Sequence, residues 1–110
     1  MSLRGALIGL GNIAVRGHAP AYAEVADRMT IVAVMDVVAE NAARAGEILP
    51  GAAFHTSLRS LLETERLDFV DICSPPHTHA AAIRACAAAG KHVLCEKPLA
   101  DRHDGTALIG

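Results

Sequence analysis

The 110-residue sequence has no tryptophan, one tyrosine and two phenylalanines, so its core must be built from small and branched aliphatic side chains. It also lacks a basic excess, because ten lysines and arginines face twelve aspartates and glutamates, whereas binding to nucleic-acid phosphates requires such an excess. No apolar run approaches the roughly 18 residues that span a bilayer, and the 52% apolar fraction is too high for a disordered chain. We therefore expect a folded, soluble protein that binds neither nucleic acid nor membrane.

Cysteine is scarce, and the three residues Cys73, Cys86 and Cys95 form no CxxC motif. An odd number without that spacing fits neither a disulfide framework nor a zinc knuckle. The N-terminal apolar stretch is too short for a signal peptide. These features predict a cytoplasmic protein in which Cys73 and Cys95 are buried apolar fillers.

Short β-rich segments alternate with alanine-rich helical segments along the chain. We expect Pro20 in the first turn of one helix and Ser57 as the N-cap of another. The expected strands are 6–8, 30–35, 53–54, 69–73 and 92–95, and two of the expected helices are 38–49 and 78–89. Such alternation predicts an α/β fold, a doubly wound parallel sheet with right-handed crossovers and strand order 3-2-1-4-5, in a single dinucleotide-binding domain of residues 1–110.

A glycine-rich segment follows the first expected strand and matches the pattern GxGxxG/A. The first glycine permits a tight turn, the second lets the backbone approach a pyrophosphate, and the third position needs a small residue. The helix that begins here offers free N–H groups to phosphate oxygens. The candidate cofactor-binding residues are therefore Gly9, Gly11, Asn12, Ile13 and Ala14. The alternative is a glycine turn without a ligand.

Asp36 ends the second expected strand, 22 residues after Ala14. A carboxylate at that position accepts hydrogen bonds from both hydroxyls of the adenosine ribose and repels a 2′-phosphate, which favours NAD over NADP as the cofactor. The residues that follow offer no cation for a phosphate, although Arg44 could fold back. The alternative is that Asp36 only caps the next helix.

Two further segments carry a family resemblance: CSPPHTH at 73–79 and GKHVLCEKPLA at 90–100. With the glycine turn, they resemble the Gfo/Idh/MocA family of glucose-fructose oxidoreductases and inositol dehydrogenases. The resemblance covers the whole chain but only the N-terminal domain of the family. It implies hydride transfer between a nicotinamide cofactor and a sugar, cyclitol or related hydroxy compound. Family members continue into an α/β substrate domain, so we expect a truncated chain that binds cofactor without turnover, from a homo-oligomeric enzyme.

The resemblance also implies roles for individual residues. Lys97 is the expected catalytic residue beside the nicotinamide, where an ammonium can hydrogen-bond the substrate hydroxyl, stabilise developing alkoxide and transfer a proton. Glu96 is expected near the nicotinamide ribose, an ion pair with a neighbouring lysine being the alternative. Ser74 and Pro75 are expected to line the cofactor channel, and His79 matches the histidine of the family signature.

Histidines and cysteines cluster in sequence without the spacing of a metal site, so we expect no metal. Neighbours two apart at a helix start, or three apart on a strand, do not share a face. This argument covers Cys73, His77, His79, His92 and Cys95. Two other functional readings stay open: a non-catalytic dinucleotide-binding sensor or scaffold that does not use Lys97, and a doubly wound domain without nucleotide.

Overall fold

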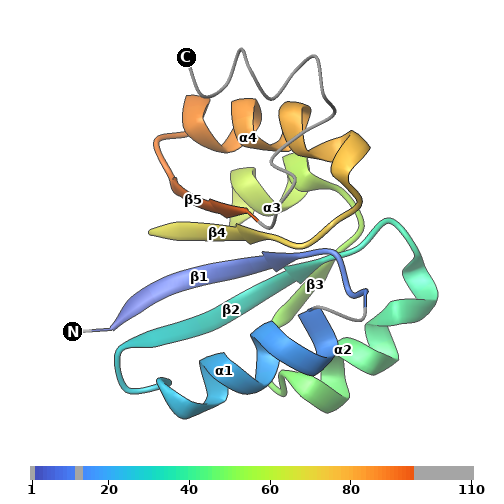
Figure 1. The fold of residues 1–110 in the computed structure, drawn as a ribbon, viewed down its shortest axis with the longest axis vertical. Helices are drawn as coiled ribbons and strands as arrows, with labels where there is room; N and C mark the ends of the chain where they lie inside the picture. Colours follow the sequence, from blue (N-terminus) through green and yellow to red (C-terminus); the bar gives the residue numbers. More distant parts are fainter. Residues whose placement is uncertain (1, 12–13, 96–110) are drawn as a thin grey trace.

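Five parallel strands form one sheet in the computed structural model, which describes residues 2–11 and 14–95 (Figure 1). The strands are β1 (Leu3–Ile8), β2 (Met29–Met35), β3 (Ala53–His55), β4 (Phe69–Ile72) and β5 (His92–Cys95). Their order in the sheet is β3-β2-β1-β4-β5, which confirms the predicted doubly wound topology. The chain therefore reverses its winding direction between β1 and β4, the position at which such sheets bind ligands.

Helices cover both faces of the sheet, α1 and α2 on one and α3 and α4 on the other (Figure 1). The four helices are α1 (Ala19–Glu24), α2 (Ala42–Ile48), α3 (Leu58–Thr64) and α4 (His79–Ala88). A π-helical turn at Ala14–His18 leads into α1, and 3-10 turns at Ala39–Asn41 and Pro76–Thr78 lead into α2 and α4. None of the helices within residues 2–11 and 14–95 has the length and apolar character needed to span a bilayer.

Local sequence signals explain where most helices begin and end. The Ser57 side chain accepts a hydrogen bond from the Ser60 N–H at 3.1 Å, which confirms the predicted N-cap. Pro20 lies in the first turn of α1, as expected. The predicted helix at 38–49 is wrong at its start, because Val38 is extended and the α-helix begins only at Ala42.

β1 begins three residues before the predicted apolar segment. Its first residues are polar or exposed, but they complete the pairing with neighbouring chain. The Arg4 N–H donates to the Asp68 carboxylate at 2.8 Å, and the Asp68 N–H donates to the Arg4 carbonyl at 2.7 Å. Backbone pairing, which apolar patterning does not report, therefore sets the start of this strand.

Each face of the sheet has its own apolar core. Leu7, Val34 and Phe69 pack beneath α1 and α2, whereas Leu61 and Ile72 belong to the core beneath α3 and α4. Small residues lie where backbone and side chains approach closely, as the shortage of aromatic residues predicts. These two cores fix the carboxyl ends of β1, β2 and β4 at a common edge, where the candidate site lies.

Candidate functional site

The turn after β1 requires glycine at its first position. Gly9 has φ +89°, and its N–H donates to the Met35 carbonyl at 2.7 Å. A Cβ at Gly9 would lie 2.8 Å from the backbone nitrogen and Cα of Ser74, closer than real Cβ contacts allow. Both backbone conformation and space therefore exclude a side chain here.

The second and third positions of the glycine motif have opposite environments, as expected: the second is open and the third is buried. A Cβ on Gly11 would meet no atom of residues 2–11 and 14–95 within 4 Å, so on the side of the described chain this backbone faces space that a ligand can approach. Ala14 is completely buried, in the core beneath α1 and α2. The other two predicted residues of the turn, Asn12 and Ile13, lie outside the described residues.

Asp36 joins the end of β2 to the glycine turn. Its Oδ2 accepts a hydrogen bond from the Leu10 N–H at 2.8 Å, and its Oδ1 accepts one from the Val38 N–H at 2.9 Å. The alternative reading of Asp36 as a helix N-cap is wrong, because Val38 holds that position in the following turn. Each carboxylate oxygen has two lone pairs, so the group keeps acceptor capacity for a ligand hydroxyl.

Arg44, on α2, folds back as the sequence allowed. Its Nη1 lies 3.5 Å from the Leu10 carbonyl oxygen, so a guanidinium group reaches the backbone of the glycine turn. Arg44 is exposed. A cation therefore lies beside the glycine turn, although none follows Asp36 directly in sequence.

Ser74 and Pro75 form the opposite side of the site, in the segment that links β4 to α4. The Ser74 and Thr78 hydroxyls are 2.7 Å apart, and Thr78 also donates to the Pro75 carbonyl at 2.7 Å. His79 is buried below this segment, with Nε2 at 2.5 Å from the Ser74 carbonyl oxygen. Since a carbonyl only accepts, Nε2 carries the hydrogen. Among the described residues, His79 thus supports the segment and is not part of the cleft lining.

A cleft of about 400 Å³ lies between these two sides. Its lining includes four of the predicted cofactor-binding residues, namely Gly9, Asp36, Ser74 and Pro75. Its apolar wall comes from the ends of β1 and β2 and from small side chains of α4. An apolar cavity with a few polar groups at one end is typical of a small-molecule site.

Cys73 and Cys95, predicted to be buried apolar fillers, both contact histidines as well. Cys73 is buried in the apolar core as predicted, and its Sγ lies 3.3 Å from Nδ1 of His18. Cys95 is only half-buried, and its Sγ lies 3.2 Å from Nδ1 of His79. The third cysteine, Cys86, is completely buried, and burial raises the pKa of its thiol to about 11.

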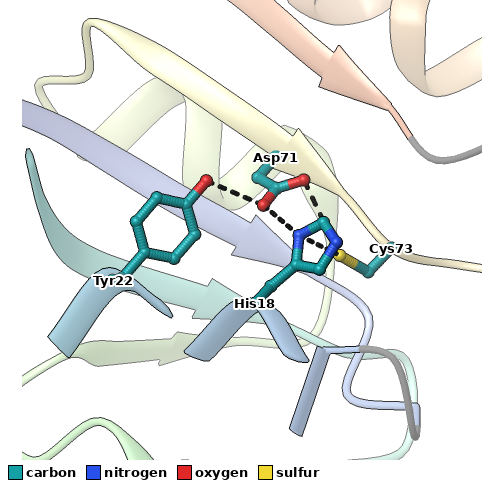
Figure 2. Close-up of polar contacts among 4 residues, drawn as sticks. All are labelled: His18, Tyr22, Asp71 and Cys73. Carbon is teal, nitrogen blue, oxygen red and sulfur yellow. Dashed lines mark hydrogen bonds and ion pairs between the residues drawn. The ribbon is translucent and has the colours of Figure 1, made fainter. Parts of the chain in front are cut away.

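Figure 2 shows a polar cluster beside the core that the sequence analysis did not find. Asp71, 1% exposed on β4, accepts a hydrogen bond from the Tyr22 hydroxyl at 2.7 Å and lies 2.5 Å from Nδ1 of His18. Burial, followed by this hydrogen bond and the nearby negative charge, raises the pKa of Tyr22. The sequence offers one signal of this cluster, namely the charged Asp71 inside a buried strand. It offers no other, because the partners of Asp71 are more than 45 residues away in the chain.

The geometry defines a doubly wound α/β domain with a dinucleotide-type cleft at its switch point. Residues 3–107 match the family model described as oxidoreductase family, NAD-binding Rossmann fold. The chain belongs to this family, Gfo/Idh/MocA, which confirms the resemblance carried by the sequence motifs.

Similar proteins agree with this assignment. Inositol 2-dehydrogenase from Klebsiella pneumoniae is 37% identical over 111 residues, which cover 99% of this chain and 32% of that protein. The WlbA dehydrogenase from Chromobacterium violaceum, solved with NADH and UDP-GlcNAcA, has a TM-score of 0.90 and 35% identity over 98% of this chain and 31% of its own. The 3-ketoreductase KijD10 from Actinomadura kijaniata, solved with NADP, has a TM-score of 0.85 and 33% identity over 99% and 34%. The chain thus spans about a third of the length of these relatives.

Proposed function

We propose that this NAD-binding domain serves a dehydrogenase that transfers hydride between NAD(H) and a hydroxyl carbon of a sugar, cyclitol or related compound. The Asp36 carboxylate at the rim of the cleft supports this proposal most directly. Its negative charge and remaining lone pairs suit the two ribose hydroxyls of NAD and oppose a 2′-phosphate. The dehydrogenase activity named for the inositol relative supports the substrate class.

The adenosine half of the cofactor would occupy the cleft between Asp36 and Ser74. The pyrophosphate would then lie against the backbone of Gly11, where a Cβ would meet no atom of the described residues. The bound nicotinamide would supply hydride chemistry. Arg44 would lie beside the turn, where its positive charge favours the phosphates.

The proposed catalytic residues follow β5 in sequence, and the described residues end at Cys95, the last residue of that strand. Lys97 and Glu96 lie outside the described residues, so their roles stay part of the proposal. Lys97 would hydrogen-bond the substrate hydroxyl and move its proton, while Glu96 would contact the nicotinamide ribose. The chain alone would bind NAD(H) without turnover, and the whole enzyme would be a homo-oligomer.

A direct test is to titrate the 110-residue chain with NADH and with NADPH and follow nicotinamide fluorescence. We expect saturable binding of NADH and at least about tenfold weaker binding of NADPH, a difference of roughly 1.4 kcal/mol. Equal or tighter binding of NADPH would contradict the role of Asp36. No binding of either cofactor would contradict the whole proposal.

The catalytic role needs a second test, in a full-length protein that contains this domain. Lys97→Ala should abolish oxidation of polyols or sugars while NADH still binds, whereas Lys91→Ala, in the turn before β5, is the matched control. Turnover retained by Lys97→Ala would exclude the catalytic role. A wild-type protein that binds NADH but oxidises or reduces no hydroxy compound would favour the sensor or scaffold alternative.

A further inference from the structure

The polar cluster at the junction of α1 and β4 contains three metal-binding side chains: His18, Asp71 and Cys73. We propose that these residues form a site for one divalent cation of borderline softness, with Zn²⁺ as the best match. The site lies on the α1 face of the sheet, opposite the α3 and α4 face that lines the cofactor cleft. The proposal therefore does not depend on the proposed function.

The distances between the donor atoms already approach those of a tetrahedral zinc site. Zinc bound at ordinary lengths to nitrogen, oxygen and sulfur keeps nitrogen and oxygen about 3.3 Å apart and sulfur about 3.5 Å from each. Here Nδ1 of His18 is 3.3 Å from Sγ of Cys73, and that Sγ is 3.7 Å from Oδ1 of Asp71. The contact between Nδ1 and the other carboxylate oxygen, Oδ2, is 2.5 Å, so the carboxylate must shift to present a single oxygen at bonding distance from the ion. In that contact a proton occupies the space that the cation would take.

Two features of the backbone bring the three donors together. Asp71 and Cys73 are two residues apart where β4 ends, so both side chains project toward α1. His18 reaches them from the π-helical turn that follows the glycine motif. Single π-helical turns often occur at functional sites. The sequence argument against a metal considered only nearby cysteines and histidines, and it could not place His18 beside β4.

The charges in the cluster also fit a divalent ion. An aspartate carboxylate and a cysteine thiolate together neutralise Zn²⁺, and a neutral imidazole completes the set. On binding, the cation would displace the thiol proton of Cys73 to solvent, and Nδ1 of His18 would give up the proton of its contact with Asp71, to Nε2 or to solvent. The site with the ion bound would then be neutral, which suits a buried position.

The neighbouring residues provide support for one ligand and a path for the ion. The Tyr22 hydroxyl donates to Oδ2 of Asp71 at 2.7 Å, which orients the carboxylate as supporting groups do in zinc sites. His18 and Asp71 line a groove together with Gly17, Tyr22 and Leu94. The ion can enter through this groove, where water or a small ligand can complete the fourth position.

The first test is to titrate the chelator-treated chain with Co²⁺, which reports its ligands by absorption. We expect one Co²⁺ per chain, tetrahedral visible bands and a thiolate charge-transfer band, with Zn²⁺ displacing the Co²⁺. Cys73→Ser should remove the charge-transfer band, and His18→Gln and Asp71→Asn should weaken binding at least about tenfold. Cys95→Ser and His77→Ala are the matched controls and should keep both the band and the affinity.

A second measurement avoids the risk that a variant does not fold. In the wild-type chain, Zn²⁺ should slow the alkylation of Cys73 at least about tenfold, as followed by mass spectrometry of the proteolytic peptides, and it should not slow that of Cys95 to the same extent. The proposal would be overturned by the absence of stoichiometric Co²⁺ binding, by a charge-transfer band that persists in Cys73→Ser, or by Zn²⁺ that leaves Cys73 unprotected. Any of these results would show that the cluster is only a hydrogen-bond network. NADH titration is an independent readout, so failure here leaves the cofactor proposal intact.

Discussion

The Asp36 carboxylate and the Leu10 N–H are 2.8 Å apart, and this hydrogen bond joins the end of β2 to the glycine turn. One side chain therefore shapes the turn and presents negative charge to the cleft. The two effects are separable, because the hydrogen bond needs only an acceptor oxygen whereas exclusion of a phosphate needs charge.

Replacing Asp36 should separate these effects. Asp36→Asn keeps one acceptor oxygen, which can still accept from the Leu10 N–H while the bond from Val38 is lost, so the turn should persist while the preference for NADH over NADPH falls at least about tenfold. Asp36→Ala also leaves the Leu10 and Val38 N–H groups without this acceptor, which should lower the free energy of unfolding by about 1–3 kcal/mol. Cofactor titrations together with urea unfolding measure both. An unchanged preference in Asp36→Asn would show that the charge does not select the cofactor.

The two motif glycines should respond differently to alanine. Gly9→Ala forces a Cβ against Ser74 at a positive φ, so the chain should lose several kcal/mol of stability or fail to fold. The Cβ of Gly11→Ala meets no atom in the part of the chain that the structure describes, so the fold should persist while NADH binding weakens at least about tenfold. Gly46→Ala, on the exposed face of α2, is the control and should keep full binding. Normal NADH affinity in Gly11→Ala would place the pyrophosphate elsewhere.

The sequence predicted the sheet order because the elements that build it depend on local patterns. Glycine turns, buried strand segments and the Ser57 cap all involve neighbours in the chain, and each is where it was predicted. The strand order followed because few topologies accommodate such an alternation.

The polar cluster escaped prediction because its contacts are long-range. Tyr22 and Asp71 are 49 residues apart, and no local pattern pairs a tyrosine of one helix with an aspartate of a distant strand. The π-helical turn also changes the phase of the helix, so regular α-helical spacing would place His18 on another face. The late start of α2 has a local cause instead, since the carboxylate of Asp36 takes the N–H of Val38, two residues further on.

Gly5 should be indispensable because of its contact with Phe69. A Cβ on Gly5 would lie 2.0 Å from Cζ of the Phe69 ring, so Gly5→Ala should destabilise the chain by about 1–3 kcal/mol or more. Replacing the Phe69 ring with the shorter leucine side chain should relieve the clash. In urea unfolding, Gly5→Ala combined with Phe69→Leu should therefore be less destabilised than the sum of the two single variants. Additive losses would show that the two residues do not compete for this space.

Cys86 should make stability depend on alkaline pH. Burial raises the pKa of its thiol from 9.0 to about 11 in the folded chain, so the unfolded state ionises first as pH rises. The stabilisation from this group is complete below pH 9 and is lost as the pH rises toward about 11. Cys86→Ala should be less stable at neutral pH and should lose less stability between pH 8 and pH 10 than wild type, as urea unfolding at each pH would measure. Parallel pH profiles for the two proteins would contradict the assignment.

The three thiols should react with iodoacetamide at different rates. Cys95 is half-buried and near Nδ1 of His79, which is the acceptor nitrogen because Nε2 faces the Ser74 carbonyl. Cys86 is fully buried with a raised pKa, so little thiolate forms and reagent cannot reach it. Peptide mass spectrometry at pH 8 should therefore find Cys95 alkylated first and Cys86 last. Replacing His79 with glutamine should slow the alkylation of Cys95, since the imidazole can no longer take the thiol proton. The substitution His77→Gln, at an exposed histidine, is the control. Equal rates at Cys95 and Cys86 would show that burial and the neighbouring histidine do not set thiol reactivity in this domain.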